Sequence, residues 1–341
     1  MLGQYLFFLG FVDCILVILF FNLLGILPVC FFSSFGPLFG LRQMVLSRFW
    51  FGWWPVKLSR WPDVVQHCFG NRALITVTVA IFNILACIGW SSVNSIVGAQ
   101  LINAVNNDVP GWAGILIIAF CTFFVTLFGY KVVHIYEFWS WIPSFIVFMI
   151  VLGEFAHSGA FMNIPMGVGE SEIGAVLSMG AVVFGFATGW TSYAADYTVY
   201  QPANQSKRKV FWWTWLGLIF PLLFTQMLGA AVITATGVDP TATDNPYLNG
   251  YNQSGNGGLL AAVLFPPLGS FGKFCLVVLA LSIIANNCPN IYSVSLTVQV
   301  LGRWTQRIPR FIWTFVATAV YIGIAIPGYS DFAIVLENFM K

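Results

Sequence analysis

The sequence predicts an all-α protein that crosses a membrane about eight times. The chain of 341 residues is 59% hydrophobic and 8% charged, whereas an average soluble domain carries about 25% charged residues. Its apolar stretches are each far longer than the ~10 residues of a membrane-spanning β-strand, so they are expected to be helices. The basic residues are also confined to alternate connections between these stretches, as in proteins inserted into a bilayer.

The expected spans follow from a bilayer core about 30 Å thick, which needs roughly 20 apolar residues per helix. In chain order they are 5–32, 73–105, 112–128, 136–155, 173–196, 211–236, 274–300 and 311–326. The first is long enough to be tilted, and a ninth apolar pattern begins after Asp331. Because the chain starts and stops within apolar segments, we expect a single transmembrane domain over residues 1–341 that is incomplete at both ends.

The connections between the spans predict the orientation. Twelve of the 14 Lys and Arg residues lie in four alternate connections, namely 42–72, Lys131, 207–209 and 303–310. Short loops rich in Lys and Arg are retained on the cytoplasmic side, so the connections 103–111, 156–172 and 237–258 are expected outside. We expect 237–258 to be irregular, because it is rich in Gly, Asn, Pro and Thr, and 257–268 to form a short amphipathic helix on the membrane surface.

Polar residues inside spans are costly and therefore point to function, since a central charge costs roughly 2.5–3.5 kcal/mol on insertion scales. The second span contains a polar stretch over residues 89–95. Trp90 and Asn94 are four residues apart and share one face of the helix. An indole beside an amide suits a planar, hydrogen-bonding ligand. The alternative is a close helix contact through Gly89 and the neighbouring serines.

The fifth span contains two glycines, three hydroxyl side chains and a run of aromatic residues over 184–196. This composition disfavours a continuous helix. In transporters, a glycine-interrupted helix near the middle of the membrane points to the substrate site, because its free backbone groups become ligands. The alternative is a packing face of small residues, since Gly185 and Gly189 have the GxxxG spacing.

The seventh span carries the most specific polar cluster, which is Asn286, Asn287 and Asn290 around Pro289. Pro289 cannot donate to the carbonyl of Ala285 and leaves it free. Each Asn side chain offers one acceptor and two donor hydrogens, which are the groups needed to pair with the polar edge of a nucleobase. The alternative is a structural cap at the cytosolic end of the helix.

Glu137 is the main acidic candidate within a span. It lies near the start of the fourth span, about one turn inside the membrane, next to the aromatic stretch 138–141. A carboxyl group at this depth is either a proton carrier or the partner of a cytosolic Arg, and the sequence leaves both open.

Other function classes lack their required residues. The seven Cys have no metal-ligand spacing, and the three His lie in separate connections or at span edges, so no metal site, cofactor or enzymatic activity is expected. The basic residues mark loops and therefore give no indication of nucleic-acid binding. The span count disfavours a seven-span receptor, and a channel does not need three Asn beside a Pro in one span.

Several sequence blocks resemble the fungal purine–cytosine permeases, a branch of the nucleobase–cation symport-1 family. The blocks are FFNLLG (20–25), FGP (35–37), GLRQM (40–44), GWS (89–91), VN (93–94), VGAQ (97–100), GW (189–190), YAADY (193–197) and NNCPN (286–290). They extend through nearly the whole chain in the family's order. The resemblance implies twelve spans on the leucine-transporter fold, built from two inverted repeats of five helices. The spans here then match family helices two to nine and the start of the tenth.

The resemblance also implies a binding site and a function. Residues at the family's binding positions are Trp90 and Asn94 on helix three, Phe186 or alternatively Trp190 on helix six, and Asn286, Asn287 and Pro289 on helix eight. The expected function is a multi-pass plasma-membrane symporter that uses the proton gradient to import cytosine, adenine, guanine and hypoxanthine by alternating access. A symporter for uracil, allantoin or thiamine, or a non-functional fragment, remains the alternative.

Overall fold

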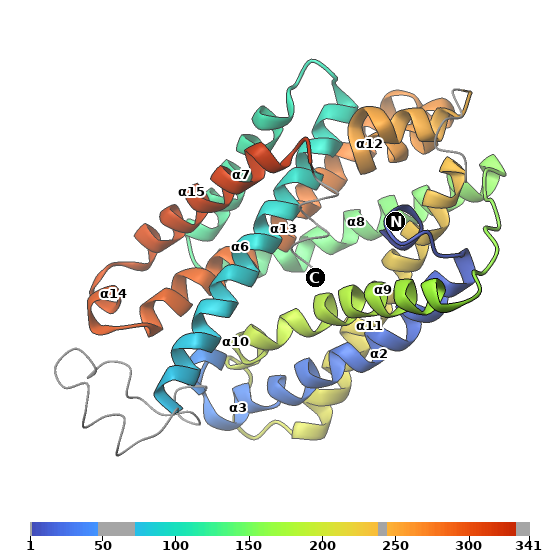
Figure 1. Cartoon of the computed structure of the whole chain (residues 1–341). Coiled ribbons are helices and arrows are strands. Elements are labelled where there is room, and N and C mark those ends of the chain that lie inside the picture. Colours follow the sequence, from blue (N-terminus) through green and yellow to red (C-terminus); the bar gives the residue numbers. More distant parts are fainter. Residues whose placement is uncertain (1, 47–71, 238–243, 332–341) are drawn as a thin grey trace.

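The computed structural model describes residues 2–46, 72–237 and 244–331, which form helices and no strands (Figure 1). The all-α fold class is therefore confirmed. The α-helices are α1 (Leu2–Tyr5), α2 (Phe11–Ser33), α3 (Phe35–Phe39), α6 (Arg72–Val105), α7 (Gly111–Leu127), α8 (Tyr130–Ser158), α9 (Glu170–Gly189), α10 (Ala194–Thr198), α11 (Lys207–Ile233), α12 (Pro246–Leu268), α13 (Ser270–Val300), α14 (Arg303–Arg307) and α15 (Arg310–Gly328). Two 3-10 helices, η2 (Trp190–Tyr193) and η3 (Thr234–Thr236), follow α9 and α11.

Seven of the described helices are long and apolar enough to cross a membrane, against the eight spans that we predicted. The third predicted span forms the apolar helix α7, but its 17 residues extend only about 26 Å at 1.5 Å per residue, less than a ~30 Å bilayer core. Helix α8 begins at Tyr130, six residues before the predicted start, so Glu137 lies about two turns into it. The predicted ninth pattern lies outside the described residues.

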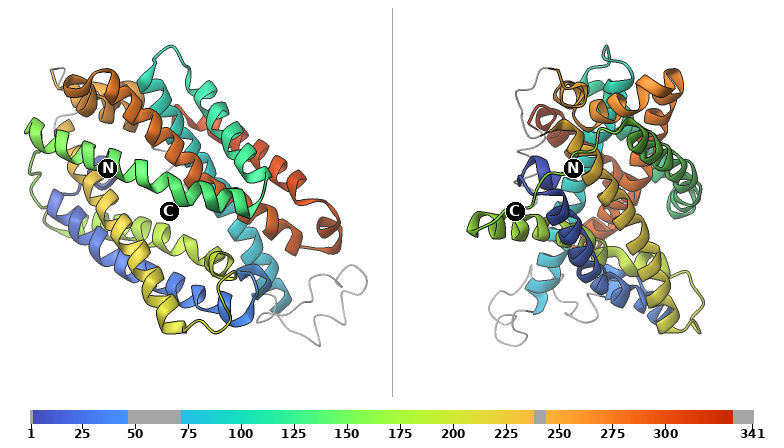
Figure 2. Two further views of the ribbon diagram at one scale, coloured as in Figure 1. Left: turned by 180° about the vertical axis from the view of Figure 1, so that it is seen from behind. Right: turned by 90° about the vertical axis from the view of Figure 1, so that its right-hand side faces the viewer.

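The long helices divide into two groups. Helix α2 packs against α9 and α11, while α6 packs against α13, α7, α12 and α15. The first group and the short helices α3 and α10 lie in the lower part of Figure 1, and the view from behind shows the same division (Figure 2). Helix α8 contacts mainly α13 and α12. The residues between the two groups are those that form the cavity described below.

The predicted interruption of the fifth span is confirmed. Helix α9 ends at Gly189, the chain forms the 3-10 turn η2, and α10 begins at Ala194. Tyr193, the last residue of this turn, has φ −139° and ψ 18°. By contrast, α6 and α13 continue as helices through their polar clusters. The polar side chains of α6 and α13 are therefore presented from regular helix faces, and those of η2 from a distorted turn.

The connection before α13 corrects one expectation. Residues 246–258, expected to be irregular, belong to α12, whose first turn is capped by the Asn245 side chain. This helix bends at Ser254 and Gly255 and folds inward, where a Cβ atom on Gly257 would overlap the carbonyl of Gln100. Helix α12 thus packs into the protein core through its apolar side chains, and the expected position of 257–268 at the membrane surface stays a prediction.

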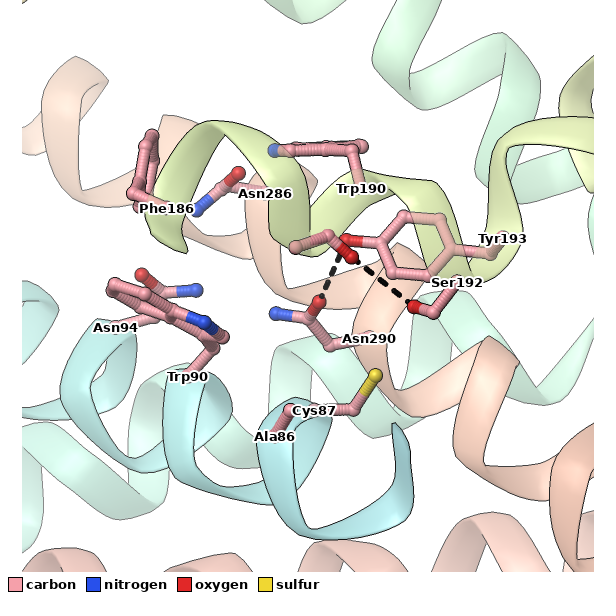
Figure 3. A pocket seen from close by; sticks show the side chains of 11 residues that line it. Ala86, Cys87, Trp90, Asn94, Phe186, Trp190, Ser192, Tyr193, Asn286 and Asn290 are labelled. Atoms are coloured by element: carbon pink, nitrogen blue, oxygen red, sulfur yellow. Dashed lines mark hydrogen bonds between the residues drawn. The ribbon is translucent and has the colours of Figure 1, made fainter. Parts of the chain in front are cut away.

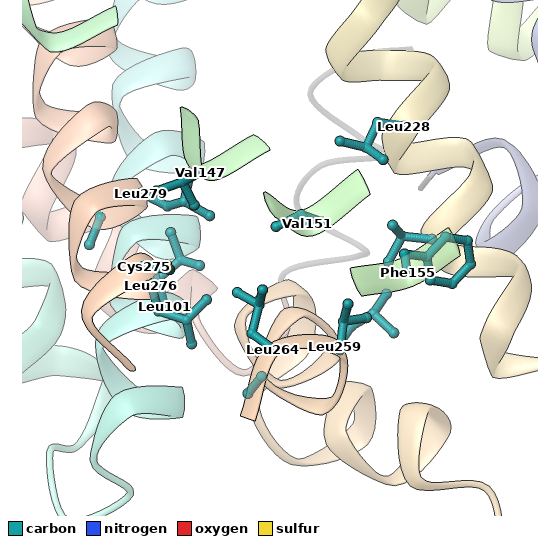
Figure 4. Packing of buried hydrophobic residues seen from close by; sticks show 14 of the residues in the cluster. Leu101, Val147, Val151, Phe155, Leu228, Leu259, Leu264, Cys275, Leu276 and Leu279 are labelled. Carbon is teal, nitrogen blue, oxygen red and sulfur yellow. The ribbon is translucent and has the colours of Figure 1, made fainter. Parts of the chain in front are cut away.

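The largest apolar cluster joins α12 to its neighbours (Figure 4). Helix α8 contributes a stripe at four-residue spacing, which is the period that places side chains on one helix face. Buried members of the cluster from α6, α8, α11, α12 and α13 include Leu101, Val147, Val151, Phe155, Leu228, Leu259, Leu264 and Leu276. The opposite face of α8 exposes large apolar side chains such as Phe138 and Trp139, as expected for a surface against lipid.

Candidate functional site

A small cavity of about 40 Å³ lies where α6, α13 and the interrupted helix α9–η2 meet (Figure 3). Its lining combines aromatic rings, amides and a thiol. The lining residues are Ala86, Cys87, Trp90, Asn94, Phe186, Gly189, Trp190, Ser192, Tyr193, Asn286 and Asn290. Five of the residues predicted from the sequence therefore share one cavity, namely Trp90, Asn94, Phe186, Trp190 and Asn286.

Three pairs of residues with four-residue spacing build most of this wall. Helix α6 contributes Trp90 and Asn94, and α13 contributes Asn286 and Asn290. The third pair is Phe186 on α9 and Trp190 at the start of η2. Side chains four residues apart lie on one face of a helix, so each element presents two groups to the same space.

The aromatic side chains meet at their edges. The rings of Trp90 and Phe186 have centroids 5.0 Å apart and planes at 75°. Trp190 and Tyr193 form a second such pair at 5.3 Å and 60°. Gly189 lies between these aromatic side chains, and a Cβ atom on it would lie 3.9 Å from the indole nitrogen of Trp90. Edge-to-face geometry is favoured between aromatic rings, so the Trp90–Phe186 pair links α6 to α9.

Two side-chain hydrogen bonds lie at the η2 end of the cavity. The hydroxyl of Tyr193 donates to Oδ1 of Asn290 at 3.3 Å. The hydroxyl of Ser192 donates to the carbonyl of Gly189 at 3.1 Å, which is the carbonyl at the end of α9. Asn94 and Asn286 are only partly buried, so their amides remain accessible from the cavity.

A second, larger cavity of about 620 Å³ continues from the small one. Both cavities are lined by Trp90, Phe186, Trp190 and Asn286. The larger cavity extends toward α12, where Leu260 borders it, and its wall is mainly apolar. Its volume falls within the ~300–1,000 Å³ of small-molecule sites. The two together combine an apolar chamber with a polar end.

Two of the predicted substrate-binding residues do not reach either cavity. Asn287 is completely buried, and neither atom of its amide has a hydrogen-bond partner in the part of the chain that the structure describes. Pro289 is also buried away from the cavities. An α-helix turns by about 100° per residue, so Asn286 and Asn290 face the cavity while the residues between them face the neighbouring helices.

Two further residues of the cavity are Asn290 and Tyr193, which the family resemblance did not assign to the binding site. Asn290 belongs to the polar cluster predicted around Pro289, and because it follows Asn286 by four residues it shares the helix face of that residue. Tyr193 had no comparable signal, since its direction depends on where α9 gives way to the 3-10 turn. Cys87, three residues before Trp90, also lines the cavity.

Glu137 lies outside the cavity but is connected to it. Its Oε1 accepts a hydrogen bond of 3.2 Å from the hydroxyl of Tyr197 on α10. The ring of Tyr197 lies 6.4 Å from that of Tyr193, whose hydroxyl contacts Asn290. Two tyrosines therefore lie between the carboxyl group on α8 and the polar end of the cavity.

Comparison with known proteins identifies relatives along the whole chain. It is 66% identical over 340 residues to a purine-cytosine permease of Emericella nidulans, which covers 100% of this chain and 62% of that protein. It is 44% identical over 344 residues to a purine-cytosine permease of Saccharomyces cerevisiae, covering 99% and 60%. A vitamin B6 transporter of the same yeast is 32% identical over 345 residues, covering 100% and 55%. The chain thus spans about three fifths of the length of these relatives.

The family match agrees with the cavity and the helices around it. Residues 2–341 match the family of permeases for cytosine/purines, uracil, thiamine and allantoin. The relatives named above are permeases or transporters and not enzymes. Several described helices are long and apolar enough to span a membrane, as a transporter requires. A multi-pass membrane protein with an aromatic and amide-lined cavity between its helices, this chain belongs to the permease family for cytosine and purines, uracil, thiamine and allantoin.

Proposed function

We propose that this protein is a secondary active transporter that imports cytosine and purine nucleobases together with protons. The observation that carries the proposal is the meeting of three residue pairs, one each from α6, α9–η2 and α13, around one cavity. Aromatic rings offer flat apolar faces, and amides offer donors and acceptors. A nucleobase has the same combination of a flat ring and a polar edge, and the names of two of the relatives cited above, both purine-cytosine permeases, support this substrate class.

Within the cavity, each group has a defined role in binding. The rings of Trp90, Phe186 and Trp190 would enclose the base, while the amides of Asn94, Asn286 and Asn290 would pair with its polar edge. Cytosine, adenine, guanine and hypoxanthine all satisfy this arrangement, because each is planar and carries both hydrogen-bond donors and acceptors. The apolar chamber toward α12 would be the approach route, since the basic connections predict that this end faces outside.

Alternating access would move the two helix groups against each other around the site. The contacts that cross between the groups support this. Trp90 meets Phe186, Tyr193 donates to Asn290, and Tyr197 donates to Glu137. Arg42, which follows α3, also lies 5.5 Å from the ring centre of Tyr292 on α13. Each of these contacts would have to change when the cavity opens to the cytosol.

Glu137 is the proposed proton carrier. It is half-buried in an apolar helix, and its carboxyl group accepts a hydrogen bond from the neutral hydroxyl of Tyr197, so a proton can bind without breaking an ion pair with that partner. The connection through Tyr197 and Tyr193 to Asn290 would couple its protonation to the occupancy of the cavity. A proton gradient across the plasma membrane would then drive uptake.

Uptake of radiolabelled cytosine tests the proposal in yeast cells that lack their own nucleobase permeases. We expect saturable uptake that a protonophore abolishes, with competition by adenine, guanine and hypoxanthine. The family also includes permeases for uracil, thiamine and allantoin, and one relative is a vitamin B6 transporter, so these four compounds serve as competitors. If one of these compounds competes strongly and purines do not compete, that compound and not the purines is the substrate.

A further inference from the structure

We propose that Tyr193 is a positioning residue that orients the Asn290 amide so that its NH2 group faces the substrate cavity. This inference rests on the proposed function and deepens it, because it specifies which chemical group the site presents at its polar end. A hydrogen-bond donor there would select bases that offer an acceptor, either a carbonyl oxygen or an unprotonated ring nitrogen.

The starting observation is the hydrogen bond between the two side chains. The Tyr193 hydroxyl donates to Oδ1 of Asn290 at 3.3 Å, and Figure 3 shows the amide nitrogen of Asn290 pointing into the cavity. Both residues are buried, at 6% and 5% exposure, yet both line the cavity. The oxygen of the amide is therefore occupied by the protein, and the nitrogen is left for a ligand.

The surroundings of Tyr193 favour this orientation over the flipped one. An Asn side chain has nearly the same shape when its oxygen and nitrogen exchange places, so only its partners distinguish the two. Tyr193 belongs to a largely apolar cluster with Ala119, Ile291, Val294 and Ala317. If the amide flipped, its NH2 group would face the phenol and the phenolic proton would lose the acceptor it uses here. A buried donor without an acceptor is unfavourable, which keeps Oδ1 toward Tyr193.

The direction of Tyr193 depends on the broken helix. Tyr193 is the last residue of η2, and its φ of −139° departs from helical geometry. This departure brings its ring toward α13 while Trp190, at the start of the same turn, faces the cavity. The interruption of the fifth span therefore has two effects. It places side chains of η2 in the cavity wall, and it positions the Tyr193 hydroxyl to hold the Asn290 amide of α13.

The first test is the variant Tyr193→Phe, which removes the hydroxyl and keeps the ring. Without the hydroxyl, Oδ1 of Asn290 has no donor in its present orientation, which favours turning the amide so that Oδ1 faces the cavity. We therefore expect the apparent KM for cytosine uptake to rise about tenfold while Vmax stays within about twofold. The matched control is Tyr321→Phe. Tyr321 belongs to the same cluster and is fully buried, but it lines neither cavity. The apparent KM of Tyr321→Phe for cytosine should therefore equal that of the unmodified protein.

A second readout separates orientation from general damage to the site. Competition by adenine is compared with that of 1-deaza-, 3-deaza- and 7-deazaadenine, each of which replaces one acceptor nitrogen by CH. In the unmodified protein, the analogue that lacks the acceptor for Asn290 should compete about tenfold more weakly than adenine. In Tyr193→Phe, this difference should shrink to about twofold or less.

The variant Asn290→Asp keeps the test available if Tyr193→Phe protein does not accumulate. A carboxylate has no NH2 group to offer, so cytosine competition should fall at least tenfold, and unchanged affinity overturns the inference. It is also overturned if Tyr193→Phe leaves both the KM and the deaza differences unchanged, or if it lowers only Vmax, because a lower Vmax alone reports a loss of folded protein. In those cases cytosine uptake by the unmodified protein still supports the transport function; only an unmodified protein that neither binds nor transports cytosine removes both.

Discussion

The indole of Trp90 and the phenyl ring of Phe186 meet edge to face across the cavity, with centroids 5.0 Å apart and planes at 75°. Trp90 is carried by α6 and Phe186 by α9, which belong to the two different helix groups. The contact therefore lies on the boundary where the groups would move during transport. It also borders both the small polar cavity and the larger apolar one.

Replacing the indole should weaken substrate binding. Base–aromatic stacking contributes about 1–3 kcal/mol per base by alanine substitution, so Trp90→Leu should raise the apparent KM for cytosine about ten- to a hundredfold. Trp139→Leu is the matched control, because Trp139 lies on the exposed face of α8. Inhibition constants for cytosine, measured in cells with equal amounts of each variant, check the prediction. Equal inhibition constants for Trp90→Leu and Trp139→Leu would show that Trp90 does not contact the substrate.

The two neighbouring asparagines of α13 should behave differently. Asn286→Ala removes an amide that borders both cavities and should cost about 1–3 kcal/mol of binding, roughly ten- to a hundredfold in KM. Asn287→Ala removes an amide that lines neither cavity, so its effect should appear in the amount of folded protein and not in KM. The sequence alone predicts a loss of cytosine affinity for Asn287 as well, and uptake kinetics of both variants distinguish the two expectations.

Glu137→Gln should remove the response of uptake to external acid. A carboxyl group that carries the proton gains it more readily as the external pH falls, so cytosine uptake by the unmodified protein should rise in that direction. Glutamine keeps a similar shape and can still accept from Tyr197, but it cannot carry the proton. Initial uptake rates between acid and neutral pH measure the effect, with Glu154→Gln on the same helix as control. A full acid response in Glu137→Gln would place the proton elsewhere.

The contact between α6 and α7 leaves no room at Gly114. A Cβ atom there would lie 2.8 Å from Cβ and 2.9 Å from Cα of Ala99. Gly114→Ala should therefore separate the two helices and destabilise the protein by about 1–3 kcal/mol, as overpacked cores are. Gly323→Ala is the control, because a Cβ on that helical glycine meets nothing within 4 Å. Thermal unfolding of the purified variants in detergent compares them, and equal melting temperatures would contradict the close packing.

Hydrophobicity and helical periodicity were sufficient to predict the fold class and several residues of the candidate site. The backbone groups of a long apolar stretch in lipid can satisfy their hydrogen bonds only within a helix, so the all-α class followed from composition and length. The pairing of Trp90 with Asn94 followed from their four-residue spacing, and the same spacing places Asn290 of the predicted polar cluster on the face of Asn286. The composition of 184–196 predicted the break in the fifth span, which occurs at Trp190.

Contacts between helices settled what periodicity left open. Four-residue spacing states which side chains share a face, but the rotation of α13 against α6 determines that Asn286 and not Asn287 meets the cavity. The backbone conformation at Tyr193 directs that side chain toward Asn290. Helix α12 can approach the Gln100 carbonyl only because Gly257 has no Cβ atom. These arrangements depend on how surfaces distant in sequence fit together, a property of the assembled bundle that no single segment of the chain contains.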